Sequence, residues 1–99
     1  MQNYRKVVGI FKRKFPEYRV NVRRVRMPHG LHGDCSRKSG NHFLIRIKSE
    51  LPEDVAIDTF LHEFAHILSW HKPGDDHGID WGVAYSKVYR IFLREYIDN

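Results

Sequence analysis

Three residues of this chain stand in an order that suits metal chemistry, because His62, Glu63 and His66 form the motif HExxH. Two histidines four residues apart lie on the same face of an α-helix, about 6 Å apart along its axis, so both imidazoles can bind one metal ion. Glu63 is not a ligand in this arrangement. Its carboxylate is placed to take a proton from a reacting water and to deliver that proton to a leaving amine. The motif therefore predicts a hydrolytic zinc site.

The composition and the flanking sequence both support this interpretation. The chain has seven histidines and five glutamates in 99 residues, which gives an expected number of accidental HExxH strings of about 0.02. Pro52, Glu53 and Asp54 supply the proline and the acidic first turn that are typical of a helix start. Apolar residues then recur with a helical period, so the motif is expected on a helix: Val55, Phe60, Leu61, Phe64, Ala65 and Leu68.

A catalytic zinc site needs a third protein ligand. The metzincin pattern HExxHxxGxxH is absent, because Ser69 and Lys72 occupy the positions of its glycine and its third histidine. His71 would point about 140° away from His66 on a continued helix. Glu95 is the one glutamate downstream of the motif, and it lies far along the next helix. Spacing alone leaves both His71 and Glu95 open.

The local sequence favours His77 as the third ligand. The segment Lys72–Asp76 contains a proline and a glycine, and we expect it to turn the chain back toward the motif. A helix is expected over Gly78–Ile97, because its apolar residues form a stripe: Trp81, Ala84, Tyr85, Val88, Ile91, Phe92 and Tyr96. A triad of His62, His66 and His77 leaves one coordination position for water, as in catalytic rather than structural zinc sites.

The segment Leu61–His66, followed by Asp76-His77-Gly78-Ile79-Asp80-Trp81, resembles the SprT-like metallopeptidases, including the small versions in bacteriophage genomes. Those proteins carry HExxH and then a histidine in a D-H-G-x-[ED]-[FW] context as third ligand. The resemblance covers about residues 55–92. It implies a zinc-dependent metallopeptidase that hydrolyses protein substrates, with Zn²⁺ held by His62, His66 and His77 and with Glu63 as the catalytic residue.

The elements that must position this site indicate one α+β domain over residues 1–99. The apolar spacing predicts an N-terminal helix over Gln2–Lys14. Three strand segments are expected to form a small antiparallel sheet: Tyr18–Arg26, Asp34–Lys38 and His42–Lys48. The HExxH helix and a C-terminal helix follow, which is the order of a minimal zincin-like domain and is also what the resemblance implies. In such folds an edge strand holds an extended substrate over the metal, and His42–Lys48 is the candidate for that strand. The alternative is an ordinary hairpin strand whose polar residues face water.

Charge is distributed unevenly along the chain. Residues 1–49 contain thirteen Lys and Arg against two acids, whereas residues 50–99 contain four against ten, so the net charges are +11 and −6. A basic half of this kind suits salt-sensitive contact with phosphates, and relatives of the SprT-like family degrade proteins bound or crosslinked to DNA. The same charges also fit a solvated face or contact with the acidic helices of the chain itself. The candidates for nucleic-acid contact are Arg19, Arg23, Arg24, Arg26, Arg46 and Lys48.

Several other features bear on the class of protein. Cys35 is the one cysteine, so an internal disulfide is excluded. No segment has the roughly 18 apolar residues of a membrane span, and basic residues interrupt any signal-peptide core in Met1–Phe15. We therefore expect a cytoplasmic protein, in the host cytoplasm if it is encoded by a phage. His29, His32 and His42 are further candidates to border the cleft.

Tyr85 is a candidate to stabilise an oxyanion, although its place on the apolar stripe favours packing. Two other classes of function fit the sequence. One is a metal-stabilised binding module that keeps the zincin fold but cleaves nothing. The other is a nucleic-acid-binding accessory protein in which zinc is structural.

Overall fold

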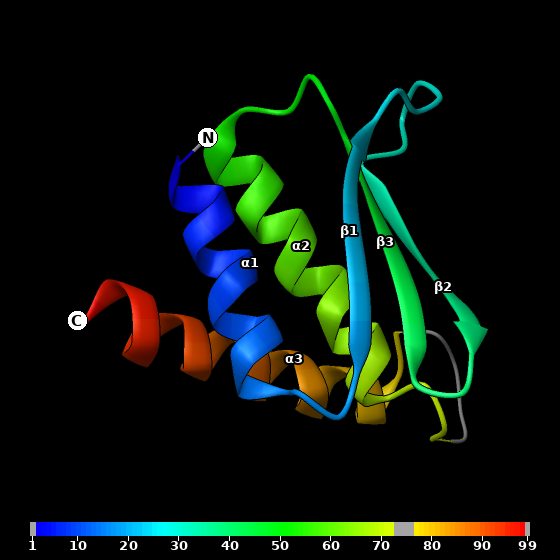
Figure 1. Ribbon diagram of the computed structural model, residues 1–99, viewed down its shortest axis with the longest axis vertical. Coiled ribbons are helices and arrows are strands. Elements are labelled where there is room, and N and C mark those ends of the chain that lie inside the picture. The colour runs from blue at the N-terminus through cyan, green and yellow to red at the C-terminus, as the bar shows by residue number, and fades with distance from the viewer. Residues whose placement is uncertain (1, 73–76, 99) are drawn as a thin grey trace.

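Helices cover one face of a three-stranded sheet in the computed structural model, which describes residues 2–72 and 77–98 (Figure 1). In chain order the elements are α1 (Gln2–Lys14), β1 (Arg19–Val25), β2 (Gly33–Ser39), β3 (His42–Lys48), α2 (Glu53–Leu68), α3 (Ile79–Phe92) and a π-helical segment, η1 (Leu93–Ile97). The α+β class and the order of the elements are confirmed. The expected turn with Pro73 and Gly74, and Asp76 after it, lie outside the described residues.

Phenylalanine side chains from α1 and α2 form the centre of the hydrophobic core. Phe11 is fully buried, and its ring centroid lies 5.8 Å from that of Phe60 and 5.1 Å from that of Phe64. The sheet contributes three buried residues of β3, which alternate along the strand: Phe43, Ile45 and Ile47. One side of α2 packs in this core. The opposite side therefore faces the cleft at the HExxH residues.

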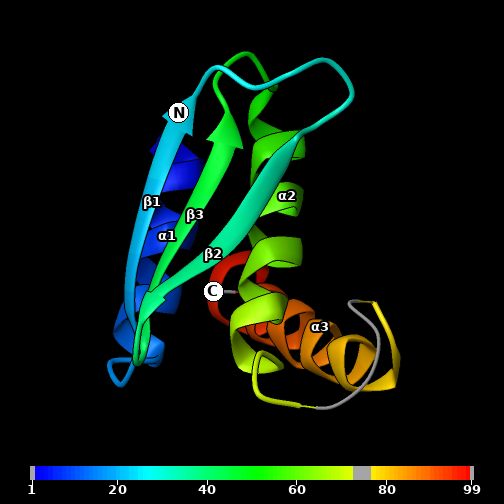
Figure 2. The same ribbon diagram turned by 90° about the vertical axis from the view of Figure 1, so that its right-hand side faces the viewer.

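The sheet is mixed, so the expectation of an antiparallel sheet is wrong for one pair of strands. β2 and β3 pair antiparallel through a hairpin at Gly40, which has a φ of 48°, whereas β1 pairs parallel with β3. The strand order is β1-β3-β2 (Figure 2). The edge role assigned to His42–Lys48 is therefore also wrong, because this strand is β3 and lies in the centre.

The physical reason for this topology is the connection over residues 26–32. It carries the chain across the end of β3, so that β1 and β2 take opposite edges. Two backbone hydrogen bonds fasten it, from the Lys48 amide to the His32 carbonyl and from the Ser49 amide to the Val25 carbonyl, each 2.8 Å long. The strand with the most buried apolar residues thus lies between two others, where both of its edges are paired.

The start of β2 lies very close to α2, and Gly33 permits this approach. A Cβ atom at position 33 would lie 2.8 Å from the carbonyl oxygen of Arg46 and 2.8 Å from Cγ2 of the buried Thr59. Only a residue without a side chain fits this space. Gly33 therefore helps to set the distance between the edge strand and the helix that carries HExxH.

The structure also defines where α2 and the helix after it end. α2 ends at Leu68, where the hydroxyl of Ser69 donates to the carbonyl of Ala65 over 3.0 Å. The helix expected over Gly78–Ile97 is α-helical only as far as Phe92 and continues as η1.

Among residues 2–72 and 77–98, no helix combines the length and the apolar character that crossing a bilayer requires.

We predict that Gly33→Ala destabilises the fold by about 1–3 kcal/mol, because the added methyl group meets backbone and a buried side chain. Gly82→Ala is the matched control. Gly82 lies inside α3, where an added Cβ atom would meet open space, so alanine there should stabilise the protein by up to about 1 kcal/mol. Urea unfolding followed by circular dichroism measures both changes, and equal stability of the Gly33→Ala variant and the unaltered protein would contradict the close approach.

Candidate metal centre

Three histidine side chains converge where α2 meets the start of α3. His62 and His66 lie one turn apart on α2, and His77 precedes Gly78, the residue before α3. One ligand atom from each ring lies within 4.8 Å of the others. The Nε2 atoms of His62 and His77 are 3.1 Å apart. The three histidines therefore lie close enough to bind one metal ion.

The arrangement of these rings fits metal coordination. Two imidazole–metal bonds of about 2.0–2.1 Å at a tetrahedral angle place their nitrogens roughly 3.3 Å apart, close to the separation between His62 and His77. Burial and the neighbouring His77 lower the pKa of His62, while Asp58 opposes them. A lowered pKa keeps the His62 imidazole neutral at neutral pH, which is the form that binds metal.

The indole of Trp81 packs against all three imidazoles. Its ring centroid lies 4.9 Å from that of His62, 5.6 Å from that of His66 and 4.8 Å from that of His77. Its Nε1 donates to the carbonyl of His62 over 3.4 Å. Trp81 therefore joins the start of α3 to α2 and restricts how the three rings turn.

Tyr85 supports Trp81 from the next turn of α3. Their rings stack at 5.0 Å, and the Tyr85 hydroxyl donates to Oδ1 of Asp58 over 3.2 Å. Burial and the Asp58 carboxylate raise the pKa of Tyr85 to about 12. The phenol thus stays protonated at neutral pH. It supports the metal centre by packing on Trp81 and by its hydrogen bond to Asp58.

A hollow of about 390 Å³ opens at the three histidines, between residues of β2 and α2. It is lined by Leu31, Gly33, Asp34, Cys35, His62, Glu63, His66, Trp70 and His77. A second hollow of about 310 Å³ continues it, lined by Gly30, His32, Gly33, Asp58, Thr59, His62 and Glu63. The two hollows together form the cleft at the metal centre, and both are lined by Glu63, which is only 7% exposed. The HExxH carboxylate therefore lies at the junction of the two hollows, beside the metal ligands.

Cys35 borders the cleft without belonging to the group of metal ligands. Burial raises the pKa of its thiol to about 12, and the charges of Glu63 and Asp34 act in the same direction. Within the described part of the chain, the group close enough to hold a metal consists of the three histidines alone.

The other candidate ligands lie elsewhere. Glu95 forms an ion pair with Lys14 of α1, with a separation of 3.4 Å between Nζ and Oε1. His71 is exposed beyond the end of α2 and does not join the group of ligands. The structure thus brings His77, and neither His71 nor Glu95, to the HExxH histidines.

The remaining histidines fall in three different places. His32 lines the second hollow. His29 is exposed in the connection between β1 and β2, and His42 lies on β3, where its Nε2 is 3.1 Å from Nδ2 of Asn21. Only His32 of these three borders the cleft.

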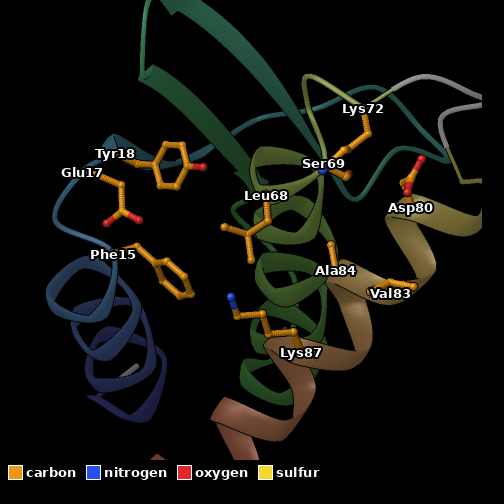
Figure 3. A pocket seen from close by; sticks show the side chains of 10 residues that line it. All are labelled: Phe15, Glu17, Tyr18, Leu68, Ser69, Lys72, Asp80, Val83, Ala84 and Lys87. Atoms are coloured by element: carbon orange, nitrogen blue, oxygen red, sulfur yellow. The ribbon is translucent and has the colours of Figure 1, made fainter.

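A separate groove of about 340 Å³ lies beside the C-terminal end of α2 (Figure 3). Its described walls share no residue with either hollow at the metal centre, and they mix apolar with oppositely charged side chains: Phe15, Glu17, Tyr18, Leu68, Ser69, Lys72, Asp80, Val83, Ala84 and Lys87. None of the three histidines contributes to it. The three histidines therefore lie at the cleft and not at this groove.

Sequence reasoning missed three residues at the cleft. Asp58 stands four residues before His62, and this helical spacing was a signal that it shares the same face of α2. Leu31 and Trp70 had no comparable signal, because one lies in a connection between strands and the other follows a helix end. Their positions depend on how the chain folds over β3.

Comparison of the chain with protein-family models, with curated proteins and with solved structures gives no match.

We predict that His77→Ala lowers the affinity for Zn²⁺ by more than about 100-fold, since it removes one of three nitrogen ligands. His71→Ala is the control, because His71 is an exposed histidine of the same region outside the group. Competition with a chromophoric chelator measures both affinities. Unchanged zinc binding by the His77→Ala variant, or a large loss in the His71→Ala variant, would show that the third ligand is misassigned.

Proposed function

We propose that this protein is a zinc-dependent metallopeptidase that hydrolyses peptide bonds of protein substrates. The observation that carries the proposal is the convergence of three histidines beside a buried glutamate in an open cleft. The same residues carry the resemblance to the SprT-like metallopeptidases, and a zincin-like arrangement is part of the proposal. Three neutral nitrogen ligands with a fourth position open are typical of catalytic zinc.

The chemistry divides between the metal and Glu63. His62, His66 and His77 would hold a zinc ion, which would supply a Lewis acid able to polarise a carbonyl and to lower the pKa of a bound water to about 7. Glu63 takes a proton from the attacking water as its oxygen bonds to the carbonyl carbon. The C–N bond then breaks, and Glu63 gives the proton to the leaving amine. The products are a carboxylic acid and an amine, and Glu63 returns to its starting state.

The edge strand next to the cleft is β2. Among the described strands it pairs with β3 alone, and residues 33–35 of β2 line the cleft. An extended polypeptide that adds to β2 as a further strand would carry its backbone past His62 and Glu63. Main-chain hydrogen bonds would then hold any extended segment, which suits unfolded or flexible regions of a protein substrate.

We predict that Glu63→Gln retains zinc and loses turnover by a factor of at least about 100, since general acid–base catalysis typically contributes 10²–10⁴-fold. Glu50→Gln is the control, because Glu50 is an exposed carboxylate before α2. Zinc content and cleavage of an unfolded protein substrate are measured on each variant. Equal cleavage by the Glu63→Gln variant would remove Glu63 from the mechanism, and zinc without cleavage in the unaltered protein would indicate a metal-stabilised binding module.

The helices leave one face of the sheet uncovered (Figure 2), and we call it the outer sheet face. Alternation along the strands places Arg19 and Arg23 of β1 on this outer sheet face, beside Arg46 and Lys48 of β3. Arg46 forms an ion pair with Asp34, and Lys48 lies 4.0 Å from Glu50. These two acids partly compensate Arg46 and Lys48, so the positive charge of the outer sheet face comes mainly from the exposed Arg19 and Arg23. We propose that this face contacts the phosphates of a nucleic acid.

The two other arginine candidates lie off this face. Arg24 donates to the carbonyls of Lys48, Ser49 and Leu51, and its guanidinium lies 5.2 Å from the centroid of the Tyr4 ring. Its guanidinium thus fastens the end of the sheet to the start of α2. Arg26 is exposed just beyond the end of β1.

We predict that Arg19→Ala combined with Arg23→Ala weakens binding to single-stranded DNA and lowers the salt slope of log K by about 1.4. Lys87→Ala combined with Arg90→Ala is the charge-matched control on α3, where both residues are exposed. Fluorescence anisotropy from 50 to 200 mM salt measures both. Equal losses in the two double variants would show that net charge, and not the outer sheet face, controls binding.

A further inference from the structure

The cleft at the metal centre has two halves of different chemistry. We infer that they select a large apolar side chain before the scissile bond and a basic side chain after it. This inference rests on the proposed peptidase function. We call the hollow with Leu31 and Trp70 the apolar half, and the hollow with Asp58 the acidic half. Glu63 and His62 lie on the boundary between them, where the reacting carbonyl must be placed.

The apolar half has two large hydrophobic side chains that the fold leaves open to solvent. Leu31 is 40% exposed and Trp70 is 38% exposed, and both line the same cleft. The Trp70 ring is held edge-to-face against the buried Phe43, with centroids 5.3 Å apart. A rigid indole and an aliphatic side chain in one cleft favour an apolar side chain of the substrate, because its entry removes all three from water.

The one acidic residue that lines only the apolar half is already paired. Asp34 accepts two hydrogen bonds from the guanidinium of Arg46, on its Oδ1 and its Oδ2. Its charge is therefore largely compensated before a substrate arrives. Cys35 contributes a protonated thiol, which packs as a small apolar group. The described surface of this half thus offers little to a charged side chain.

The acidic half differs in size and in charge. Gly30 has open space beside it, and Asp58 is exposed there. The hydroxyl of Tyr85 holds the Asp58 carboxylate in place through a hydrogen bond of 3.2 Å. Of the residues that the structure describes along this half, none is a lysine or an arginine. A fixed carboxylate in an open hollow favours a lysine or arginine of the substrate.

The direction of β2, together with antiparallel pairing of the substrate, decides which half receives which residue. We choose antiparallel pairing because it is slightly more stable per residue than parallel pairing. β2 runs from Gly33 toward Ser39, and a substrate strand that pairs with it antiparallel runs the opposite way. The part of the substrate that precedes the scissile bond then lies beside Cys35, in the apolar half. The part that follows the bond continues past Gly33 into the acidic half. Cleavage is therefore expected between a large apolar residue and a basic one.

In the first experiment, the zinc-loaded protein digests a peptide library of random sequence, and mass spectrometry identifies the cut sites. We expect Leu, Phe or Met to exceed Ala before the cut by about tenfold or more. We expect Lys and Arg to exceed Asp and Glu after the cut by about threefold or more, since the carboxylate is exposed. Cleavage without either preference would overturn the inference and leave the proposed function intact.

Variants of each half separate the two preferences. Asp58→Lys should reverse the second preference in favour of Asp and Glu, while Asp54→Asn, an exposed acid one turn earlier on α2, should leave it unchanged. Leu31→Ala should reduce the first preference, while Ile97→Ala, which shortens an aliphatic side chain that is 54% exposed in η1, should not. An unchanged second preference in the Asp58→Lys variant would remove Asp58 as its cause.

A binding measurement covers the case in which no peptide is cut. The zinc-loaded Glu63→Gln variant is titrated into fluorescein-labelled peptides that differ only in the residues flanking one central bond. Tighter binding of Leu-Lys than of Ala-Glu would support the selectivity of the cleft even though hydrolysis had failed. Equal binding of both peptides by this variant, together with absence of cleavage by the unaltered zinc-loaded protein, would overturn both the inference and the proposed function.

Discussion

The burial of one side of α2 determines where the groups of the metal centre lie. Phe60 and Phe64 are fully buried against Phe11 of α1, and this contact fixes the rotation of the helix about its axis. The helical period then places His62, Glu63 and His66 toward the cleft. A different rotation would bury the histidines or would expose phenylalanine rings, and either change is unfavourable by several kcal/mol.

Two contacts complete the site from segments that are distant in sequence. Gly33 lets the edge strand β2 approach Thr59 of α2. The strand therefore forms one wall of the cleft. Trp81 packs against the three imidazoles and ties the start of α3 to α2. The histidine motif is thus local, whereas the cleft around it depends on both a strand and a second helix. A substrate meets the metal ligands only in the space that these contacts define.

The sequence predicted those parts of the molecule that depend on local periodicity. The bounds of β3 were predicted closely, because apolar residues alternate in Phe43, Ile45 and Ile47. The start of the HExxH helix was also predicted, from Pro52 and the two acidic residues after it. The metal-binding triad was also predicted, since the spacing between His62 and His66 is a property of one helix. His77 required a turn that returns the chain, and the three rings do converge.

The pairing of β1 with β3 could not be predicted from local patterns. Strand periodicity shows which residues face the core but not which neighbour a strand selects, and the choice here depends on the route of residues 26–32 over the end of β3. The same connection brings Leu31 to the cleft. The grouping of the three histidines could therefore be predicted from the sequence, whereas the edge strand and the walls of the cleft required the fold.

The central claim is that three histidines hold one metal ion and leave a position open beside Glu63. X-ray absorption spectroscopy of the zinc-loaded protein tests it most directly, because zinc–nitrogen and zinc–oxygen distances of about 2.0–2.1 Å differ clearly from a zinc–sulfur distance of about 2.3 Å. We predict one zinc per chain with three imidazole ligands, one further light-atom ligand and no sulfur. A sulfur ligand from Cys35 would show a closed structural site, and failure to bind stoichiometric zinc would contradict the metal centre itself.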